Sequence, residues 1–240
     1  MEVWLIFAIT TCIAGVVLGF TGFGGALVMA PVFLTIIDPV TATAIILIVN
    51  AVAGVANLRA VGAETDWTIA RPLCIAACIA SPIGLWLLHA VDVDAVRQLV
   101  ASAVLVASTG LALRWRFPFS IRSRLGNAAL GFASGSLFGI GGVGGPPVII
   151  GMLAENLSAL VTRATLLTYF AVVQSFTLLL MVLQGAVSWR SALLGLALAP
   201  VYFLGNRLGL RLLTPERAGI FRKVSIATLF AVAGYALLPR

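Results

Sequence analysis

Long apolar stretches alternate with short polar gaps along the whole chain. A helix that crosses a bilayer needs about 20 apolar residues. Stretches of roughly this length occur at 42–58, 68–89, 96–113, 158–183, 189–205 and 218–238. The other apolar stretches form two pairs, 3–20 with 25–37 and 126–138 with 146–154. This pattern predicts an all-α, polytopic integral membrane protein without a separate soluble domain.

A glycine-rich break splits each of the two pairs. The first break is Gly19–Gly25 and the second is Gly135–Pro147. Backbone that leaves helical geometry inside a membrane is tolerated only where protein or a water-filled cavity surrounds it. Glycine permits tight turns and close approach of a ligand, and Pro146 suits the start of a helix. We therefore predict that two half-helix N-termini direct free N–H groups into one cavity, which would bind an anion.

The two breaks belong to an internal repeat. Several short matches occur in the same order in both parts of the chain, which favours two halves, 1–113 and 126–240, joined by a basic linker at 114–125. All of it would form one transmembrane domain. The matches are Gly22–Gly25 with Gly139–Gly142, Pro31-Val32 with Pro147-Val148, Asp66-Trp67 with Ser188-Trp189, Gly84 with Gly205, and Gly110–Leu113 with Gly234–Leu237.

The distribution of basic residues suggests a topology. Arginine and lysine favour cytoplasmic loops, so the linker is placed in the cytoplasm. If each broken pair crosses the membrane once, the 15 basic residues divide into 8 inside and 7 outside. If each pair is instead a hairpin that returns to its starting side, 12 lie inside and 3 outside. The count favours hairpins, with three spanning helices in each half, inverted repeats and both termini outside. If Arg207 lies within the membrane, the alternative remains that each glycine-broken pair crosses the membrane fully.

Composition and charge exclude several classes of protein. Hydrophobic residues make up 61% of the chain and charged residues 10%, against about 25% charged in soluble proteins, and the mean hydropathy is +1.14. The net charge of +7 is attributed to topology, since no basic run carries the aromatic residues of a nucleic-acid surface. Zinc motifs are absent, and the one histidine lies far from any serine-protease pattern. No catalytic residue, metal or cofactor is expected.

The glycine breaks also carry a family resemblance. The segments Gly19–Pro31 and Gly135–Val148 resemble the repeated motif of the TauE/SafE family of sulfite-exporter-like membrane permeases, and the likeness extends over essentially the whole chain. The resemblance implies a multi-pass transporter of sulfur-containing anions in the bacterial inner membrane. The chain is short for that family. Its second motif has Pro146-Pro147 where the first has Ala30-Pro31.

The candidate substrate-binding residues lie in the breaks and in the apolar segments that follow them. Polar residues in those segments also suit hydrogen bonds between helices. Arg163 is the one cation just inside such a segment, where it suits either the interface or the substrate. The GxxxG pairs Gly15/Gly19, Gly131/Gly135 and Gly205/Gly209 are assigned to helix packing. The candidates are Gly22, Phe23, Gly24, Gly25, Asn50, Gly139, Gly141, Gly142, Gly144, Gly145, Pro146, Arg163, Thr168 and Gln174.

The expected function is transport, and export in particular, of a small sulfur-containing anion such as sulfite, sulfoacetate or another organosulfonate. The anion would bind at the midplane between the two broken helices and move by alternating access. An anion channel of the same fold and a carrier of small carboxylates are the alternatives. The expected partners are the anionic substrate and the lipid bilayer. A homodimer is left open, and nucleic acid is not expected.

Overall fold

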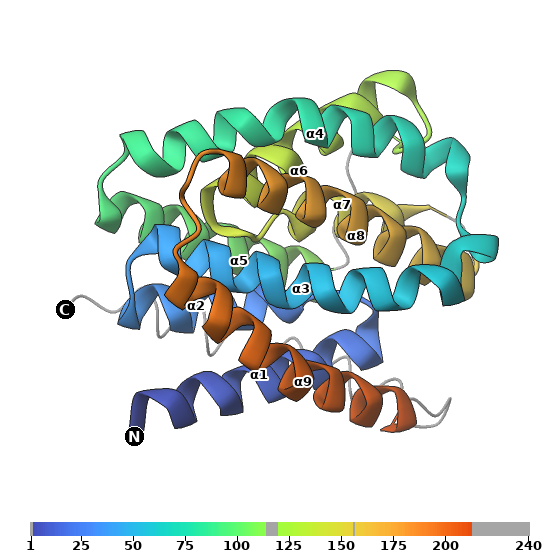
Figure 1. The fold of residues 1–240 in the computed structure, drawn as a ribbon. Helices are drawn as coiled ribbons and strands as arrows, with labels where there is room; N and C mark the ends of the chain where they lie inside the picture. The colour runs from blue at the N-terminus through green and yellow to red at the C-terminus, as the bar shows by residue number, and fades with distance from the viewer. Residues whose placement is uncertain (1, 114–119, 156, 213–240) are drawn as a thin grey trace.

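The computed structural model describes residues 2–113, 120–155 and 157–212, and all regular structure within these ranges is helical (Figure 1). The prediction of an all-α protein is confirmed for this part of the chain. The second half of the repeat is described only up to residue 212, so the predicted segment 218–238 lies outside it. The helices are α1 Glu2–Thr21, α2 Gly25–Ile36, α3 Pro39–Val61, α4 Trp67–Ala90, α5 Val93–Ala112, α6 Arg124–Gly141, α7 Gly145–Ala154, α8 Ala159–Leu183 and α9 Trp189–Leu212, with a short 3-10 helix at Gly62–Glu64.

Among the described residues, 5 helices are long and apolar enough to cross a membrane: α1, α3, α4, α8 and α9. The structure differs from the sequence pattern at two helices. The predicted span 96–113 forms α5 but is not among the five, and its start carries the polar residues Asp94, Arg97 and Gln98. Helix α1 has spanning length by itself, although the sequence pattern placed it in a broken pair.

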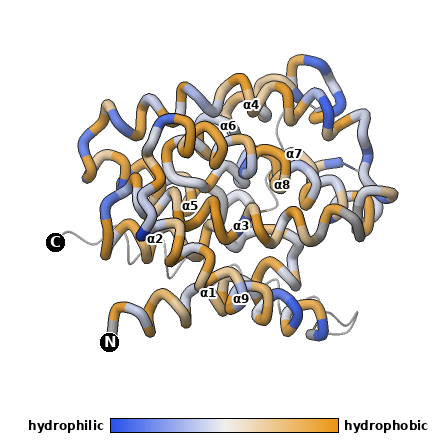
Figure 2. The backbone as a smooth tube through the Cα atoms, in the orientation of Figure 1, coloured by the Kyte–Doolittle hydropathy of each residue, from blue (hydrophilic) through white to orange (hydrophobic). Residues whose placement is uncertain are grey.

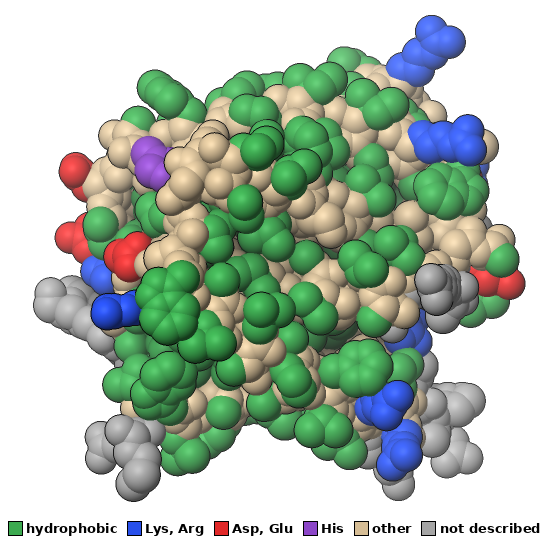
Figure 3. Space-filling model, viewed as in Figure 1, with side chains coloured by type: hydrophobic (Ala, Val, Ile, Leu, Met, Phe, Trp, Pro, Cys, Tyr) green, Lys and Arg blue, Asp and Glu red, His purple; other side chains and the backbone are tan. Residues whose placement is uncertain are grey.

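Apolar surface lies between two ends that carry the charges. Hydrophilic segments gather mainly where helices begin and end (Figure 2). On the face shown in Figure 3, the acidic and basic side chains lie toward the two sides of the view, and hydrophobic side chains fill most of the area between them. This distribution is expected for a membrane protein whose middle region contacts lipid and whose two ends contact water.

Each glycine-broken pair folds back on itself as a hairpin. In the first pair, Phe7 near the start of α1 packs against Phe33 near the end of α2, with ring centroids 4.6 Å apart. In the second pair, Ser120, just before α6, donates a hydrogen bond to Glu155 at the end of α7. The two ends of each pair therefore lie together, and the glycine break forms the tip of the hairpin.

The two halves exchange helices. Helix α1 packs along α9, and α6 packs along α4, while α3 and α8 pack against each other. Both exchanged pairs are parallel. Gly15 and Gly19 lie against Tyr202 and Asn206, and Gly135 lies against Ala77. Each half therefore supplies the packing partner for the first helix of the other half.

Glycine makes the two exchanged contacts possible. A Cβ atom added to Gly15 or Gly205 would overlap a backbone oxygen of the opposite helix, and the same holds for Gly84 and Gly135. Small residues let helices in membranes approach until their backbones touch. The packing role predicted for the GxxxG pairs is thus confirmed. We call these contacts the α1–α9 seam and the α4–α6 seam.

Candidate functional site

The two breaks share one geometry. Helix α1 ends at Thr21 and α2 begins at Gly25, and α6 ends at Gly141 and α7 begins at Gly145. The residue that follows the first helix has positive φ in both breaks, +80° at Gly22 and +71° at Gly142. L-residues with a side chain rarely adopt this conformation. These glycines therefore fix the positions at which the two helices stop.

The structure corrects the register of the internal repeat. The sequence matches had placed Gly22–Gly25 over Gly139–Gly142, which is three residues too early, because α6 continues through Gly141. The equivalent segment is Gly142–Gly145. With this register every glycine of the first set recurs 120 residues later. The sets are Gly15, Gly19, Gly22, Gly24 and Gly25, and Gly135, Gly139, Gly142, Gly144 and Gly145.

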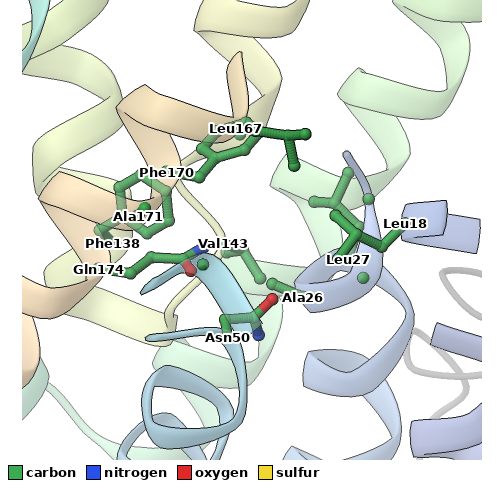
Figure 4. A pocket seen from close by; sticks show the side chains of 14 residues that line it. Leu18, Ala26, Leu27, Asn50, Phe138, Val143, Leu167, Phe170, Ala171 and Gln174 are labelled. Carbon is green, nitrogen blue, oxygen red and sulfur yellow. The ribbon is translucent and has the colours of Figure 1, made fainter. Parts of the chain in front are cut away.

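A pocket lies where the two breaks meet the central helices α3 and α8 (Figure 4). Its empty space is about 480 Å³, including the part that opens outward. Both halves contribute equivalent positions to it, for example Leu18 with Phe138 and Gly25 with Gly145. The lining residues are Leu18, Gly24, Gly25, Ala26, Leu27, Asn50, Gly54, Phe138, Val143, Gly145, Leu167, Phe170, Ala171 and Gln174, none of which carries an ionisable side chain.

The first turn of α2 offers free backbone donors to this pocket. Its N–H groups at Gly25, Ala26 and Leu27 donate to no group in the described ranges, and the first N–H that is paired is that of Val28, with Gly24 as acceptor. All three residues line the pocket. Unpaired donors at a helix start carry the positive end of the helix dipole. This is the chemistry that binds an oxyanion.

The start of α7 offers fewer donors. Its second and third residues are Pro146 and Pro147, and proline has no N–H. Among the first three residues of α7, only Gly145 can donate. The two half-helix N-termini therefore differ in the N–H groups that their first turns can offer. The prolines remove two donors from the first turn of α7, and in the second break the N–H groups of Val143, Gly144 and Gly145 donate to no group in the described ranges.

Asn50 lies in the pocket wall with a fixed orientation. Its Oδ1 accepts a hydrogen bond from the Tyr202 hydroxyl at 2.7 Å, and its Nδ2 donates to the Ile46 carbonyl at 2.8 Å. A primary amide nitrogen has two hydrogens. One N–H of Asn50 therefore stays free for a ligand.

Gln174 lines the pocket from the other side. Its side chain is 5% exposed, and in the described part of the chain no hydrogen bond to it is present. Figure 4 shows its amide end directed into the pocket, as is that of Asn50. A buried polar group is costly unless a partner satisfies it. This amide therefore needs either water or a ligand.

The structure brings only some of the predicted site residues into the pocket. Gly24, Gly25, Asn50, Gly145 and Gln174 line it. The remaining candidates lie outside the lining, and for several of them the structure shows another role. These residues are Gly22, Phe23, Gly139, Gly141, Gly142, Gly144, Pro146, Arg163 and Thr168.

Four of these have clear packing or hydrogen-bonding roles. Gly139 lies in the α4–α6 seam, where a Cβ would overlap the Leu85 backbone, and a Cβ on Gly141 would overlap a methyl group of Val100. The Thr168 hydroxyl is 2.8 Å from that of Thr65. The Gly144 carbonyl accepts a hydrogen bond from Ser134, which in turn accepts one from Tyr169. Of these contacts, the one from Ser134 to Gly144 holds the second break.

Arg163 holds the tip of the first hairpin. Its Nη2 donates to the Gly19 carbonyl at 3.1 Å, and a Cβ on Gly22 would lie 2.7 Å from its Cγ. A cation near the last carbonyls of a helix interacts favourably with the helix dipole. The structure thus gives Arg163 the end of α1 as its partner.

Sequence reasoning missed the apolar part of the pocket. Phe138, Leu167 and Phe170 line it, but an apolar residue in an apolar segment carries no signal of its own. The repeat offers one signal. At the corrected offset of 120, Phe170 is the equivalent of Asn50, and Gln174 is the equivalent of Gly54. Because an amide and an aromatic ring occupy equivalent positions, the two halves give the pocket sides of different chemistry.

A charged cluster lies apart from the pocket. Arg122 contacts Asp66 at 3.1 Å and Glu155 at 3.9 Å, which joins the starts of α4 and α6 to the end of α7. The hydrogen bond from the Thr68 hydroxyl, helped by the charge of Arg122, holds the pKa of Asp66 below its usual value. Glu155 is the one acidic residue directly after a short helix, and it belongs to this cluster.

The family of the chain follows from a comparison with known families. A model described as Sulfite exporter TauE/SafE matches residues 7–236. The chain belongs to the TauE/SafE family. The match includes both glycine breaks and every residue that lines the pocket. No curated protein and no solved structure matches the chain. As a TauE/SafE protein with five apolar helices of spanning length in its described part, it is a multi-pass membrane protein of a transporter family.

Proposed function

We propose that this TauE/SafE protein carries a small sulfur-containing anion out of the cell across the inner membrane, and that the anion binds in the pocket between the two glycine breaks. Sulfite, sulfoacetate and other organosulfonates are the candidates. The observation that carries the proposal is the convergence of unpaired donors on one pocket. These are the three N–H groups of α2, the free amide of Gln174 and one N–H of Asn50.

The donors suit the oxygens of a sulfite or sulfonate group. Such a group presents three oxygens on one side, and each accepts hydrogen bonds. Inside a protein, where the dielectric constant is low, hydrogen bonds to a charged acceptor are about twice as strong as neutral ones. A site made of neutral donors also holds an anion without the strong attraction of a paired cation. This suits a carrier, which must release what it binds.

The exchange of helices supports alternating access by inverted repeats. Each seam brings two backbones into contact, so in this mechanism α1 would move with α9 and α6 would move with α4. The pocket lies between these pairs and α3 and α8. Rocking of one pair relative to the other would open the pocket first to one end of the molecule and then to the other.

Transport by proteoliposomes tests the proposal. Liposomes that contain the purified protein and are loaded with sulfite should release it with saturable kinetics, and organosulfonates should compete, while neutral analogues such as dimethyl sulfone should not. Liposomes without protein are the control. Release that rises linearly with concentration would favour a channel, and competition by a neutral solute as strong as by organosulfonates would contradict binding by helix N-termini.

The inverted arrangement makes a prediction about accessibility. The charged residues at the end that holds Asp66, Arg122 and Arg211 should face the cytoplasm, and the turn at Gln184 should face outward. In a variant without native cysteines, Arg211→Cys should react with a membrane-impermeant maleimide only after the cells are opened, and Gln184→Cys should react in intact cells. Labelling of Arg211→Cys from outside would contradict this topology.

A further inference from the structure

We propose that the two halves of the pocket have different tasks: the first half binds the oxyanion head of the substrate, and the second half receives an apolar substituent. The site would then prefer a monoanion with a short carbon chain, such as an alkanesulfonate, to an inorganic oxyanion or a dianion such as sulfoacetate. The inference rests on the proposed function, since it concerns the same pocket.

The first-half wall consists of the start of α2 together with Asn50, and Tyr202 of α9 lies behind it. Three neighbouring N–H groups of α2 are unpaired. The Tyr202 hydroxyl lies directly against Gly25, where a Cβ would overlap it, and it donates to Asn50. The bonds to Tyr202 and to the Ile46 carbonyl leave one N–H of the Asn50 amide without a partner. The wall therefore presents mainly donors, which is what an oxyanion requires.

The second-half wall consists of the start of α7 together with Phe138, Val143, Leu167 and Phe170. These four side chains are apolar, Gln174 on the same helix as Phe170 adds an amide, and the prolines remove the N–H groups of the second and third residues of α7. The Phe170 ring is 3.7 Å from the position of a Cβ on Gly145. The centroids of Phe138 and Phe170 are 6.1 Å apart in an edge-to-face arrangement. Their side chains lie together on one side of the pocket in Figure 4.

The equivalence of the two halves makes this contrast informative. Asn50 and Phe170 occupy matched positions on α3 and α8, and both line the pocket. The first half offers three N–H groups at the start of its short helix, where the second half has Gly145, Pro146 and Pro147. At the matched pair Asn50 and Phe170 and at the start of the short helix, the second half is thus less polar than the first, whereas the matched pair Gly54 and Gln174 places an amide in the second half.

Only one orientation of an amphipathic anion satisfies both walls. With its head at the first-half wall, the sulfonate oxygens pair with the donors of α2 and Asn50, and the carbon chain packs on the aromatic rings. The reverse orientation would leave the α2 donors unpaired against carbon, and it would bury the charge against phenylalanine. Gln174 lies one helical turn beyond Phe170 on α8, and its free amide reaches into the pocket. It can donate to the same head from the opposite side.

The walls also limit the charge of the substrate. No cationic side chain lines the pocket, so one negative charge is balanced by neutral donors alone. A carboxylate at the far end of the substrate, as in sulfoacetate, would face Phe138 and Phe170 without a partner. An inorganic oxyanion would fill the first-half wall but would leave the apolar wall in contact with water.

Binding measurements on the purified protein test the inference. The probes are propane-1-sulfonate, sulfoacetate, sulfite and sulfate, with propan-1-ol as the uncharged control. We expect propane-1-sulfonate to bind at least tenfold more tightly than each of the other anions, and propan-1-ol not to bind. Equal or tighter binding of sulfite or sulfoacetate would overturn this inference and leave the proposed function standing. Binding of none of the anions would overturn both.

A matched pair of variants tests the role of the second-half wall. Phe170→Asn copies the first-half residue into the second half, and Phe170→Leu keeps the position apolar. Phe170→Asn should lower the preference for propane-1-sulfonate over sulfite at least tenfold, and Phe170→Leu should keep most of it. Pro146→Ala adds a backbone donor without adding bulk, and it should lower the same preference about threefold even if Phe170→Asn does not fold. An unchanged preference in Pro146→Ala, or in a folded Phe170→Asn, would overturn the inference.

Discussion

Replacement of Gly84 by alanine should leave little folded protein in the membrane. A Cβ at this position would overlap the backbone oxygen of Ser136 and lie 2.9 Å from the Cα atom of Gly139. Both obstacles are backbone atoms of α6, so no side chain can move aside. Overpacking typically costs about 1–3 kcal/mol and occasionally more, which is a large part of the stability of a small domain. The yield of monodisperse protein in detergent and its unfolding temperature measure the effect.

Gly62→Ala is the matched control for this substitution. Gly62 follows α3 with φ of −61°, and a Cβ there would meet no atom within 4 Å. Alanine in an unstrained position costs nothing and can stabilise by about 0.4–1 kcal/mol. The yield of Gly62→Ala should equal that of the wild type. If Gly84→Ala were as stable as Gly62→Ala, the α4–α6 seam could not be a backbone contact.

Replacement of Gln174 by glutamate should abolish substrate binding. The two side chains have nearly the same shape, but an ionised carboxylate accepts hydrogen bonds and cannot donate them. It would face the bound anion in a pocket whose lining carries no cation. We expect affinity to fall at least a hundredfold, which corresponds to about 2.8 kcal/mol. Isothermal titration with sulfite and with propane-1-sulfonate measures the loss.

Two controls separate charge from shape in this experiment. Gln174→Leu removes the donors without adding a charge and should weaken binding about tenfold, by about 1.4 kcal/mol. Gln98→Glu makes the same chemical change at an exposed position at the start of α5 and should bind as the wild type does. A folded Gln174→Glu protein with unchanged affinity would mean that the anion does not approach this amide.

The sequence identified the elements of the site better than their register. Both breaks and the packing glycines were predictable because glycine clusters are rare inside apolar segments, and the hairpins were predicted from the distribution of basic residues. The position at which α6 stops was not, since a run of glycines from 139 to 145 does not show which one takes positive φ. The spacing of the five glycines is the same in both halves, and a comparison of all five would have shown where α6 stops.

Polar candidates were predicted with mixed success for a physical reason. A polar side chain in an apolar helix needs a partner, and that partner is either a ligand or another part of the protein. Gln174 has no partner in the described chain, whereas Thr168 has Thr65 and Arg163 has Gly19. The sequence shows the need for a partner but not its identity. Only the fold separates the two cases.

The exchange of first helices has a consequence for synthesis at the ribosome. Gly15 and its partner Tyr202 are 187 residues apart, whereas Gly84 and Ser136 are 52 apart. Chains grow at about 5–20 residues per second, so the α4–α6 seam can form within about 3–10 s of the insertion of α4. Helix α1 waits about 10–40 s for α9, with its glycine face open to lipid or to a helper protein. Helix α1 is thus synthesised first but is among the last helices to pack against its partner.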